Sequence, residues 1–327
     1  MEKLSVINNC YQDNFIRIFK NIIDEFLMIH HGEYEYIIGE INNIKNVIDE
    51  EKEYLEISSL KLNIYYKSHS IINSRSKALN ILSEIEKVIK DKSSLFMLNG
   101  YIDNNICGGI LLKEKFYCFF KTEIIESDGF YFLSVCIDKA IVFAINDNFN
   151  ETRLIDPTLF KNPIGGVLIS DNMEKRKKLE EMIKKLNAIY SQKEQYKDCY
   201  DDLENKVPFI ITLTSSSVKK NLIKIKNVIL NQINEIPLEE VREYIDKEVI
   251  LIKNKIYKQS IEMFYEYCNQ NNIIYLCDKE CEKEKELKQE NILFTPFMMR
   301  LNKKNCAYCN KKAEKEYIIL KRENVFY

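Results

Sequence analysis

Four cysteines late in the sequence have a spacing that could hold a metal ion. They form a C-x3-C pair and a C-x2-C pair, separated by a long charged segment: Cys277, Cys281, Cys306 and Cys309. Four thiolates at the corners of a tetrahedron make a structural zinc site, which braces a fold and leaves no open position for catalysis. The alternative is two unrelated pairs of thiols, with Cys277 ending a buried strand. Glu282 and Asn310 stand where zinc knuckles usually carry glycine.

A serine cluster followed by two lysines could hold an anion. The residues are Ser215, Ser216, Ser217, Lys219 and Lys220, and they follow a predicted strand and open a predicted helix. Backbone N–H groups at a helix N-terminus attract phosphate, and ligands of open α/β sheets bind at the carboxyl ends of strands. The alternative is that a serine only caps the helix. Since no glycine follows Gly166, a P-loop or Rossmann phosphate loop is not expected.

A third stretch interleaves positive charges with aromatic rings. It contains Lys61, Tyr65, Tyr66, Lys67, His69, Arg75 and Lys77. Such a pattern could stack bases and hold phosphates of a nucleic acid. The alternative interpretation is a strand followed by the polar start of a helix.

Histidine is scarce, which limits acid–base chemistry. His30 and His31 lie beside Glu33 and Glu35, a set that could ligate a metal or move protons. However, adjacent histidines point in different directions, and the C-terminal end of a helix favours histidine through its dipole alone. Because the last histidine is His69, a Ser–His or Cys–His couple is excluded from the second half of the chain.

The composition excludes several classes of protein. The 48 basic and 50 acidic residues give a net charge of -2, which argues against a protein that coats nucleic acid through bulk charge. Arginine, which grips phosphate and guanine with paired hydrogen bonds, is much rarer than lysine. The sequence has no signal peptide and no apolar run long enough for a membrane span. We therefore expect a cytoplasmic protein whose ten cysteines are reduced thiols.

The segment from Asp171 to Asn205 has the clearest helical pattern. Asp171 and Glu174 have the spacing of a capping box, and apolar residues then recur at steps of three and four. This spacing predicts a long helix with a coiled-coil seam. Such a seam would serve self-association or bind a partner helix.

The pattern before this helix predicts an α+β half. Amphipathic helices are expected over 12–30 and 74–90. Short apolar runs with turns between them predict an antiparallel β-meander over 95–145, including a strand over 140–145. A last strand is expected at 167–169.

The pattern after the helix predicts an α/β half with a partly parallel sheet and a zinc-ribbon-like tail. Strands are expected over 209–213, 249–252, 273–276 and 318–321, and helices over 217–233, 238–246, 259–269 and 280–290. The predicted domains are 1–170, the long helix 171–206, and 207–327.

These observations predict a non-enzymatic binding or assembly protein with a structural zinc clip. DNA, RNA or a larger protein assembly is the expected partner. The alternative is an α/β enzyme that binds a phosphorylated or nucleotide ligand at Ser215–Ser217.

Overall fold

The computed structural model describes residues 15–29, 34–37, 53–57, 61–152, 154, 156–159, 164–168, 177–178, 181, 184, 208–213, 215–270, 272–277, 282–297 and 305–327. The chain divides into two compact units, and neither is one continuous segment. Unit 1 contains residues 1–15, 92–94 and 148–256. Unit 2 contains residues 16–91, 95–147 and 257–327. Each unit has its own β-sheet.

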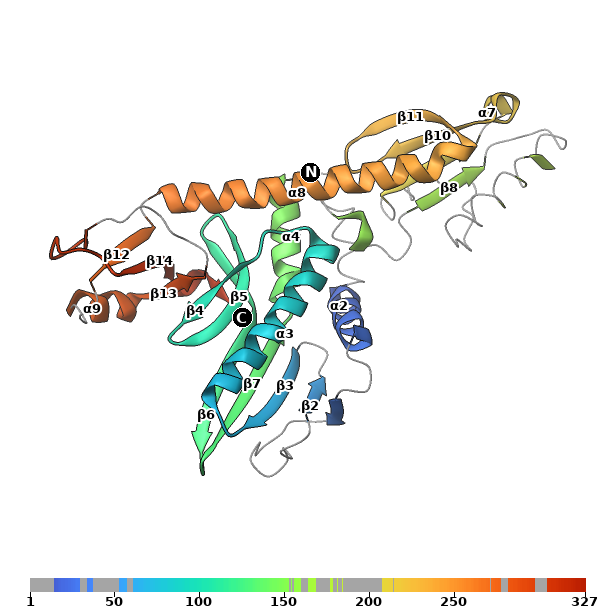
Figure 1. The fold of residues 1–327 in the computed structure, drawn as a ribbon. Helices are drawn as coiled ribbons and strands as arrows, with labels where there is room; N and C mark the ends of the chain where they lie inside the picture. The colour runs from blue at the N-terminus through green and yellow to red at the C-terminus, as the bar shows by residue number, and fades with distance from the viewer. Residues whose placement is uncertain are drawn as a thin grey trace. The chain divides into compact units, whose positions relative to one another are not determined.

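Unit 2 is built around an 11-stranded sheet (Figure 1). Along the sheet the strands are β1 (Tyr34–Ile37), β2 (Glu53–Ile57), β3 (Lys61–Ser68), β7 (Phe130–Asp138), β6 (Lys115–Ser127), β5 (Asn105–Leu112), β4 (Leu98–Ile102), β13 (Asn291–Pro296), β14 (Lys315–Lys321) and β12 (Ile273–Leu276). The short strand β15 (Val325–Phe326) pairs with β6 in parallel. Apart from this pair and the parallel pair of β1 and β2, the neighbours are antiparallel. The prediction of helices with a large antiparallel sheet is confirmed.

Tight turns join the strands of the β4–β7 meander. Asp103 and Asn104 take positive φ angles of 48° and 67°, and Asp128 and Gly129 take 55° and 80°. Two consecutive left-handed residues give a hairpin turn whose twist matches that of its strands, and short polar residues and glycine tolerate this conformation best. These turns fix the register of the sheet.

Helices cover the apolar parts of the sheet. Helix α3 (Ile71–Ser93) packs on one face, where a Cβ on Gly108 would lie 2.8 Å from Leu82 of the helix. On the other face, the second part of α8 (Val241–Asn269) contributes Phe264, Tyr267 and Cys268 to a buried cluster with Phe116 and Phe294. The other helices assigned to unit 2 are α2 (Phe15–Ile29, from Ile16 onward), the first part of α4 (Ala140–Thr152) and α9 (Glu282–Glu290).

Unit 1 has a four-stranded sheet in the order β11 (Gln232–Pro237), β10 (Leu222–Asn227), β9 (Phe209–Leu213) and β8 (Ile164–Leu168). Only β8 and β9 pair in parallel. The short helix α7 (Ser215–Lys220) and three single 3-10 turns, Pro157–Leu159 and Leu238–Glu240 in unit 1 and Arg322–Asn324 in unit 2, complete the described elements. Ile223, Ile225 and Val241 are fully buried, so β10 and the start of α8 supply much of the core of unit 1.

Three predicted elements are wrong: the helix over 217–233 and the strands over 140–145 and 249–252. The helix expected over 217–233 is α7 followed by the β10–β11 hairpin, because Asn221 and Asn231 adopt left-handed φ angles that end a helix and turn a chain. The strand expected over 140–145 is the start of α4.

The segments expected over 238–269 form one 3-10 turn and the single helix α8. Its run of apolar residues at 249–252 is not a strand, since Ile252 is buried while Ile250 and Leu251 are exposed. Of the helix predicted over 171–206, only Lys177, Lys178, Glu181 and Lys184 lie in the described part, and all four are helical.

Candidate functional site

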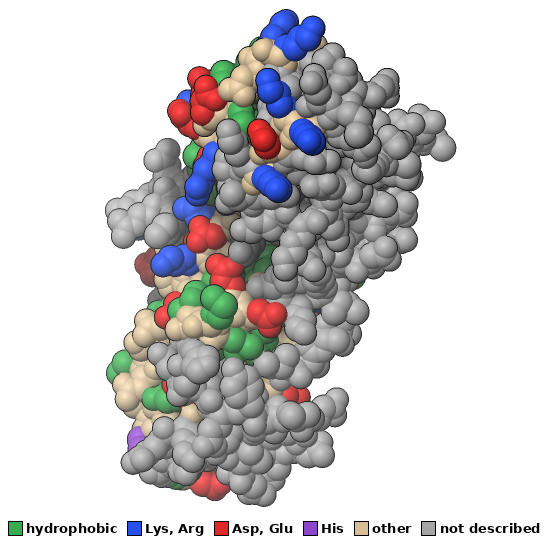
Figure 2. Space-filling view, turned by 90° about the vertical axis from the view of Figure 1, so that its right-hand side faces the viewer, with side chains coloured by type: hydrophobic (Ala, Val, Ile, Leu, Met, Phe, Trp, Pro, Cys, Tyr) green, Lys and Arg blue, Asp and Glu red, His purple; other side chains and the backbone are tan. Residues whose placement is uncertain are grey.

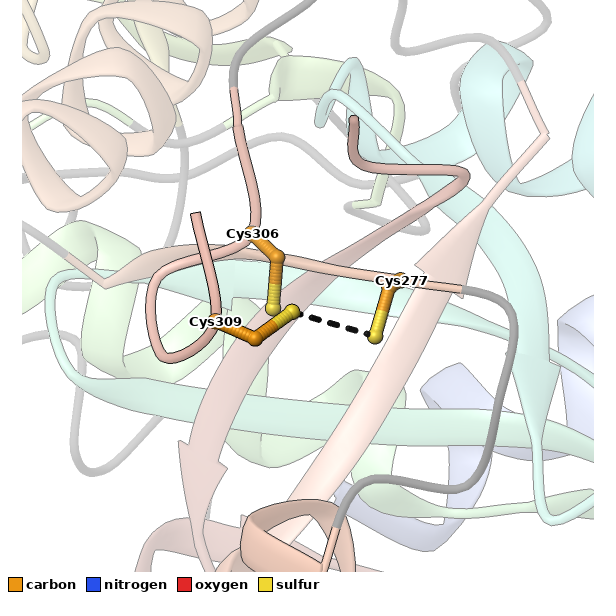
Figure 3. A group of neighbouring side chains, drawn as sticks. All are labelled: Cys277, Cys306 and Cys309. Carbon is orange, nitrogen blue, oxygen red and sulfur yellow. Dashed lines mark hydrogen bonds between the residues drawn. The ribbon is translucent and has the colours of Figure 1, made fainter. Parts of the chain in front are cut away.

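Three of the four predicted metal ligands lie together in unit 2 (Figure 3). The Sγ atoms of Cys277, Cys306 and Cys309 all lie within 4.8 Å of one another, and those of Cys309 and Cys277 are 3.6 Å apart. Cys281 lies outside the described residues. The three thiols could hold a metal ion.

Backbone hydrogen bonds explain why these thiols meet. Cys277 directly follows β12, and the loop that carries the other two cysteines is tied to that strand. Ala307 N–H donates to the carbonyl of Tyr275 at 2.9 Å, and Glu314 N–H donates to that of Leu276 at 2.9 Å. Within the loop, Asn310 N–H donates to the carbonyl of Cys306 at 3.1 Å, and Asn310 has a φ of 56°. Asparagine therefore serves at the turn where sequence reasoning looked for glycine.

The electrostatics of the cluster favour a thiolate at Cys306. Backbone N–H groups of Cys309 and Tyr308 donate to its sulfur and lower the pKa of the Cys306 thiol to about 6. The hydrogen bond with Cys309 raises the pKa of Cys277 to about 11. The Cys306 thiol therefore loses its proton most easily, and binding of a cation would deprotonate the other two thiols.

The spacing of the sulfurs fits zinc. A Zn–S bond of about 2.3 Å in a tetrahedron places sulfur atoms about 3.8 Å apart. The 3.6 Å between Cys309 and Cys277 is close to this value. Cys306 also packs with Ile274 and Leu276 in a small buried cluster, so a metal here would join the loop to the sheet.

The stretch predicted to contact nucleic acid forms β3 and the start of α3. Its lysines have partners within the protein: Lys61 pairs with Asp138 at 3.4 Å, and Lys77 pairs with Glu53 at 2.7 Å. Lys67 lies 3.9 Å from the ring centroid of Phe130.

Tyr65 of the same stretch is buried and donates a hydrogen bond to Glu56, while Arg75 is exposed and Tyr66 is half-buried. The structure thus turns only part of this stretch toward solvent.

The predicted anion site lies on α7, directly after β9. Ser217 is buried, whereas Ser216, Lys219 and Lys220 are exposed. Both lysines lie in the last turn of this six-residue helix, where the helix dipole itself favours a cation. Of the histidine set, His30, His31 and Glu33 lie outside the described residues, and Glu35 belongs to β1.

A polar face of the large sheet was missed by the sequence analysis. In antiparallel strands, residues directly opposite each other point to the same face. Register therefore aligns one row across five strands: Glu56, Asn63, Cys136, Lys121 and Cys107. Tyr65, Ser134 and Glu123 form the next row on this face.

We call this surface the polar face. It carries the buried carboxylate of Glu56 and the exposed side chains of Lys121 and Glu123. The Glu56 carboxylate is 8% exposed and accepts hydrogen bonds from Tyr65 Oη at 2.7 Å and Asn63 Nδ2 at 3.4 Å. Burial and this bond raise the pKa of Tyr65, which keeps it a donor. Lys121 and Glu123 are exposed. Alternating polar positions in each strand were visible in the sequence, but the register that joins them was not.

Comparison with known proteins gives a likeness of fold. No protein family matches the sequence, and no curated protein matches it. The prolyl-tRNA synthetase of Cryptosporidium parvum, complexed with halofuginone and AMPPNP, is similar in structure with a TM-score of 0.62 and 13% identity, over 79% of this chain and 67% of that one. The same enzyme complexed with L-proline and AMP gives a TM-score of 0.64 and 12% identity, over 83% and 72%.

This likeness corrects the functional prediction. The chain shares its fold with an enzyme whose structures hold an adenine nucleotide, so the prediction of a non-enzymatic binding or assembly protein is wrong. The predictions of a coiled coil and of a multi-subunit assembly are likewise not supported. That prediction rested on the apolar seam expected over 171–205 and on the lack of a complete set of catalytic residues in the sequence. No described helix is both long and apolar enough to cross a membrane.

Proposed function

We propose that this protein is an enzyme that binds an adenine nucleotide and an amino acid on the polar face of unit 2. The observation that carries the proposal is the shared fold, over about four fifths of the chain, with an enzyme seen with L-proline and AMP. The proposed reaction is amino acid activation, in which a carboxylate oxygen attacks the α-phosphorus of ATP and pyrophosphate leaves. RNA is the proposed acceptor of the activated amino acid.

The polar face supports this chemistry with groups of both charges. A nucleotide phosphate needs a cation, and Lys121 is exposed on β6 in this face. An amino acid also carries an ammonium group, which a carboxylate such as Glu56 or Glu123 would bind. Lys61 is less suited to phosphate because Asp138 already pairs with it. Lys121 is therefore the residue whose loss should matter most.

Binding and exchange measurements test the proposal. Calorimetry with AMPPNP and with L-proline should detect binding, and ATP–pyrophosphate exchange should depend on an added amino acid drawn from a panel of all twenty. Lys121→Met should weaken AMPPNP binding, while Lys255→Met, which removes an exposed lysine of α8, should not. If neither nucleotide nor amino acid binds, or if both variants behave alike, the proposed site is wrong.

We also propose that exposed lysines of unit 1 contact RNA. Figure 2 shows basic side chains, with acidic ones among them, over the part of unit 1 that includes α7 and β10. The described residues there include the exposed Lys219, Lys220 and Lys224. A gel-shift series with tRNA should show binding that weakens steeply as salt rises. Replacing Lys219 and Lys220 with Glu should reduce that binding, and unchanged binding would exclude them.

The third element of the proposal is a structural zinc ion held by Cys277, Cys306 and Cys309. The sulfur spacing and the lowered pKa of Cys306 support it. Cys281 remains the predicted fourth ligand. A metal in this position would hold β12 and the 305–314 loop together and would take no part in the reaction.

A further inference from the structure

The loop that carries the C-x2-C pair, residues 305–312, lies along the outer edge of β12, the last strand of the large sheet in its described part. The carbonyl of Leu276 accepts a hydrogen bond from Glu314 N–H at 2.9 Å, on the side of β14. The carbonyl of Tyr275 accepts one from Ala307 N–H of the loop at 2.9 Å. Because consecutive carbonyls point to opposite sides of a strand, the loop covers the side of β12 away from β14. An uncovered edge strand would be a template for pairing with another molecule.

Two thiols face each other where this loop meets the end of β12. Figure 3 shows the side chains of Cys277 and Cys309 pointing toward one another, and their Sγ atoms are 3.6 Å apart. The S–S bond of a disulfide is about 2.05 Å long, so the two sulfurs would have to approach by about 1.5 Å. Rotation about the Cα–Cβ bond of either side chain can supply a shift of this size without moving the backbone.

Exposure distinguishes this pair from the third thiol of the cluster. Cys309 is exposed and Cys277 is half-buried, whereas Cys306 is 3% exposed. Cys306 also packs with Ile274 and Leu276, so drawing its sulfur into a new bond would open a small apolar cluster. A small oxidant therefore reaches Cys309 first, and Cys277 is placed to react with it next.

We propose that Cys277 and Cys309 are a modification site, at which hydrogen peroxide forms a reversible disulfide when the cluster holds no metal. The Cys309 thiol attacks one peroxide oxygen, giving a sulfenic acid and one water. The Cys277 thiol then displaces the sulfenic oxygen as a second water and closes the S–S bond. In sum, two thiols and one peroxide give one disulfide and two waters. A dithiol such as dithiothreitol reverses the change by thiol–disulfide exchange.

The disulfide would join the loop to the end of β12 by a covalent bond, as the proposed zinc ion would by coordination. The two forms exclude each other, because zinc binds cysteine as a thiolate and a disulfide offers none. In either form the loop stays on the edge of β12. The disulfide shares two ligands with the proposed zinc site but requires neither zinc nor a nucleotide.

Peptide mapping of the full-length protein, first treated with a chelator, tests the proposal. The protein is exposed to a small excess of hydrogen peroxide, its remaining thiols are alkylated in denaturant, and it is digested with trypsin. Cleavage after lysine releases Cys277 within residues 259–279 and both cysteines of the loop within residues 305–311. Mass spectrometry should find these two peptides linked, with Cys306 alkylated, and dithiothreitol should separate them.

Fragmentation of the linked peptides locates the bond, since residues 259–279 also contain Cys268. A bond between Cys277 and Cys309 is expected. Unlinked peptides from the folded wild type, or a bond from Cys309 to Cys306 or to Cys281 instead, would overturn the proposal.

Two serine variants separate the disulfide from metal binding. Cys306→Ser removes a proposed zinc ligand but neither sulfur of the pair, so it should give the linked peptides as the wild type does. Cys309→Ser should give none. Near-ultraviolet circular dichroism checks that each variant is folded. Loss of the link in folded Cys306→Ser would assign the reaction to Cys306 and contradict the proposed pair.

Zinc added before the peroxide distinguishes the possible failures. If the cluster binds zinc, the yield of linked peptides should fall. A link that forms equally with and without zinc would contradict the proposed zinc site while supporting the disulfide, and zinc binding without a link in the chelated protein would do the reverse. Because the readout is a covalent bond, its failure is also distinct from a failure to bind AMPPNP.

Discussion

Tyr65 donates a hydrogen bond of 2.7 Å to the carboxylate of Glu56, and both side chains are buried on the polar face. The two residues lie on neighbouring strands, β3 and β2, which pair in antiparallel orientation. The bond therefore anchors the parallel-paired edge of the large sheet to its antiparallel part.

Replacing Tyr65 with Phe should destabilise the protein. The ring would still fill its place, but the Glu56 carboxylate would lose its short hydrogen bond, and bonds to charged groups contribute about 1.5–3 kcal/mol. Urea unfolding measures the change in the free energy of unfolding. The matched control is Tyr66→Phe, since Tyr66 is only half-buried. Equal stability of Tyr65→Phe and wild type would show that this bond adds nothing.

The cysteine cluster should bind one zinc ion per chain. Elemental analysis of the purified protein measures the zinc, and Cys306→Ser or Cys309→Ser should remove it. Cys268→Ser is the control, because Cys268 is buried in another cluster. A chelator should lower the stability of the wild type but not of Cys306→Ser. Full zinc content in Cys309→Ser would contradict the proposed ligand set.

Asp156 should make the protein more stable as pH falls through the mildly acidic range. Burial raises the pKa of Asp156 above its ordinary 3.8, although Ser94 and Thr158 donate to it. In the window between 3.8 and the raised pKa, the folded state binds more protons than the unfolded state, so the free energy of unfolding increases as pH falls.

The comparison with Asp156→Asn isolates this contribution from that of other carboxylates. Thermal unfolding of both proteins across this range should show a smaller advantage of the variant, or a larger deficit, as pH decreases. The difference between them should be constant if Asp156 has no raised pKa in the folded state. Lys253, 3.8 Å away, opposes the rise, so Lys253→Met should widen the window.

Alanine should be tolerated at Gly129 better than at Gly109. At Gly109 a methyl group would collide with the backbone of Tyr117, and overpacking of this kind costs about 1–3 kcal/mol or more. At Gly129 nothing lies within 4 Å, and only the φ of 80° strains the substitution, by about 1–2 kcal/mol. Urea unfolding of both variants gives the comparison. A milder effect at Gly109 would mean that β5 and β6 can separate there.

Local patterns in the sequence predicted much of the sheet-rich half but not its full extent. The turns predicted between the apolar runs form at Asp103–Asn104 and Asp128–Gly129, because short polar residues and glycine tolerate positive φ angles whatever the distant contacts. The pairing of β13 with β4, which joins residues 291–296 to residues 98–102, has no local signal. The row that aligns Glu56 with Lys121 across four strands had no local signal either, since register is set by contacts between distant strands.

The prediction for the second half of the chain failed where the apolar spacing of a short segment suited two kinds of element. The residues from Leu222 to Ile233 have apolar spacing that suits either a helix or a hairpin. They form a hairpin because Asn221 and Asn231 adopt positive φ angles, which end a helix and turn the chain. The spacing of the cysteines is a local property that groups Cys277 with the C-x2-C pair in the sequence, and the structure brings these three thiols together. Metal binding by them stays a prediction.

The pairing of β4 with β13 also determines how the chain can be shortened. A truncation after Glu290 would remove β13, β14 and β15, and β4 would become an outer strand with unpaired N–H and C=O groups. Such a strand is a template for pairing with another molecule, so the shortened protein should aggregate. For recombinant work, the last residues of the chain are as much a part of the sheet as the meander at its centre.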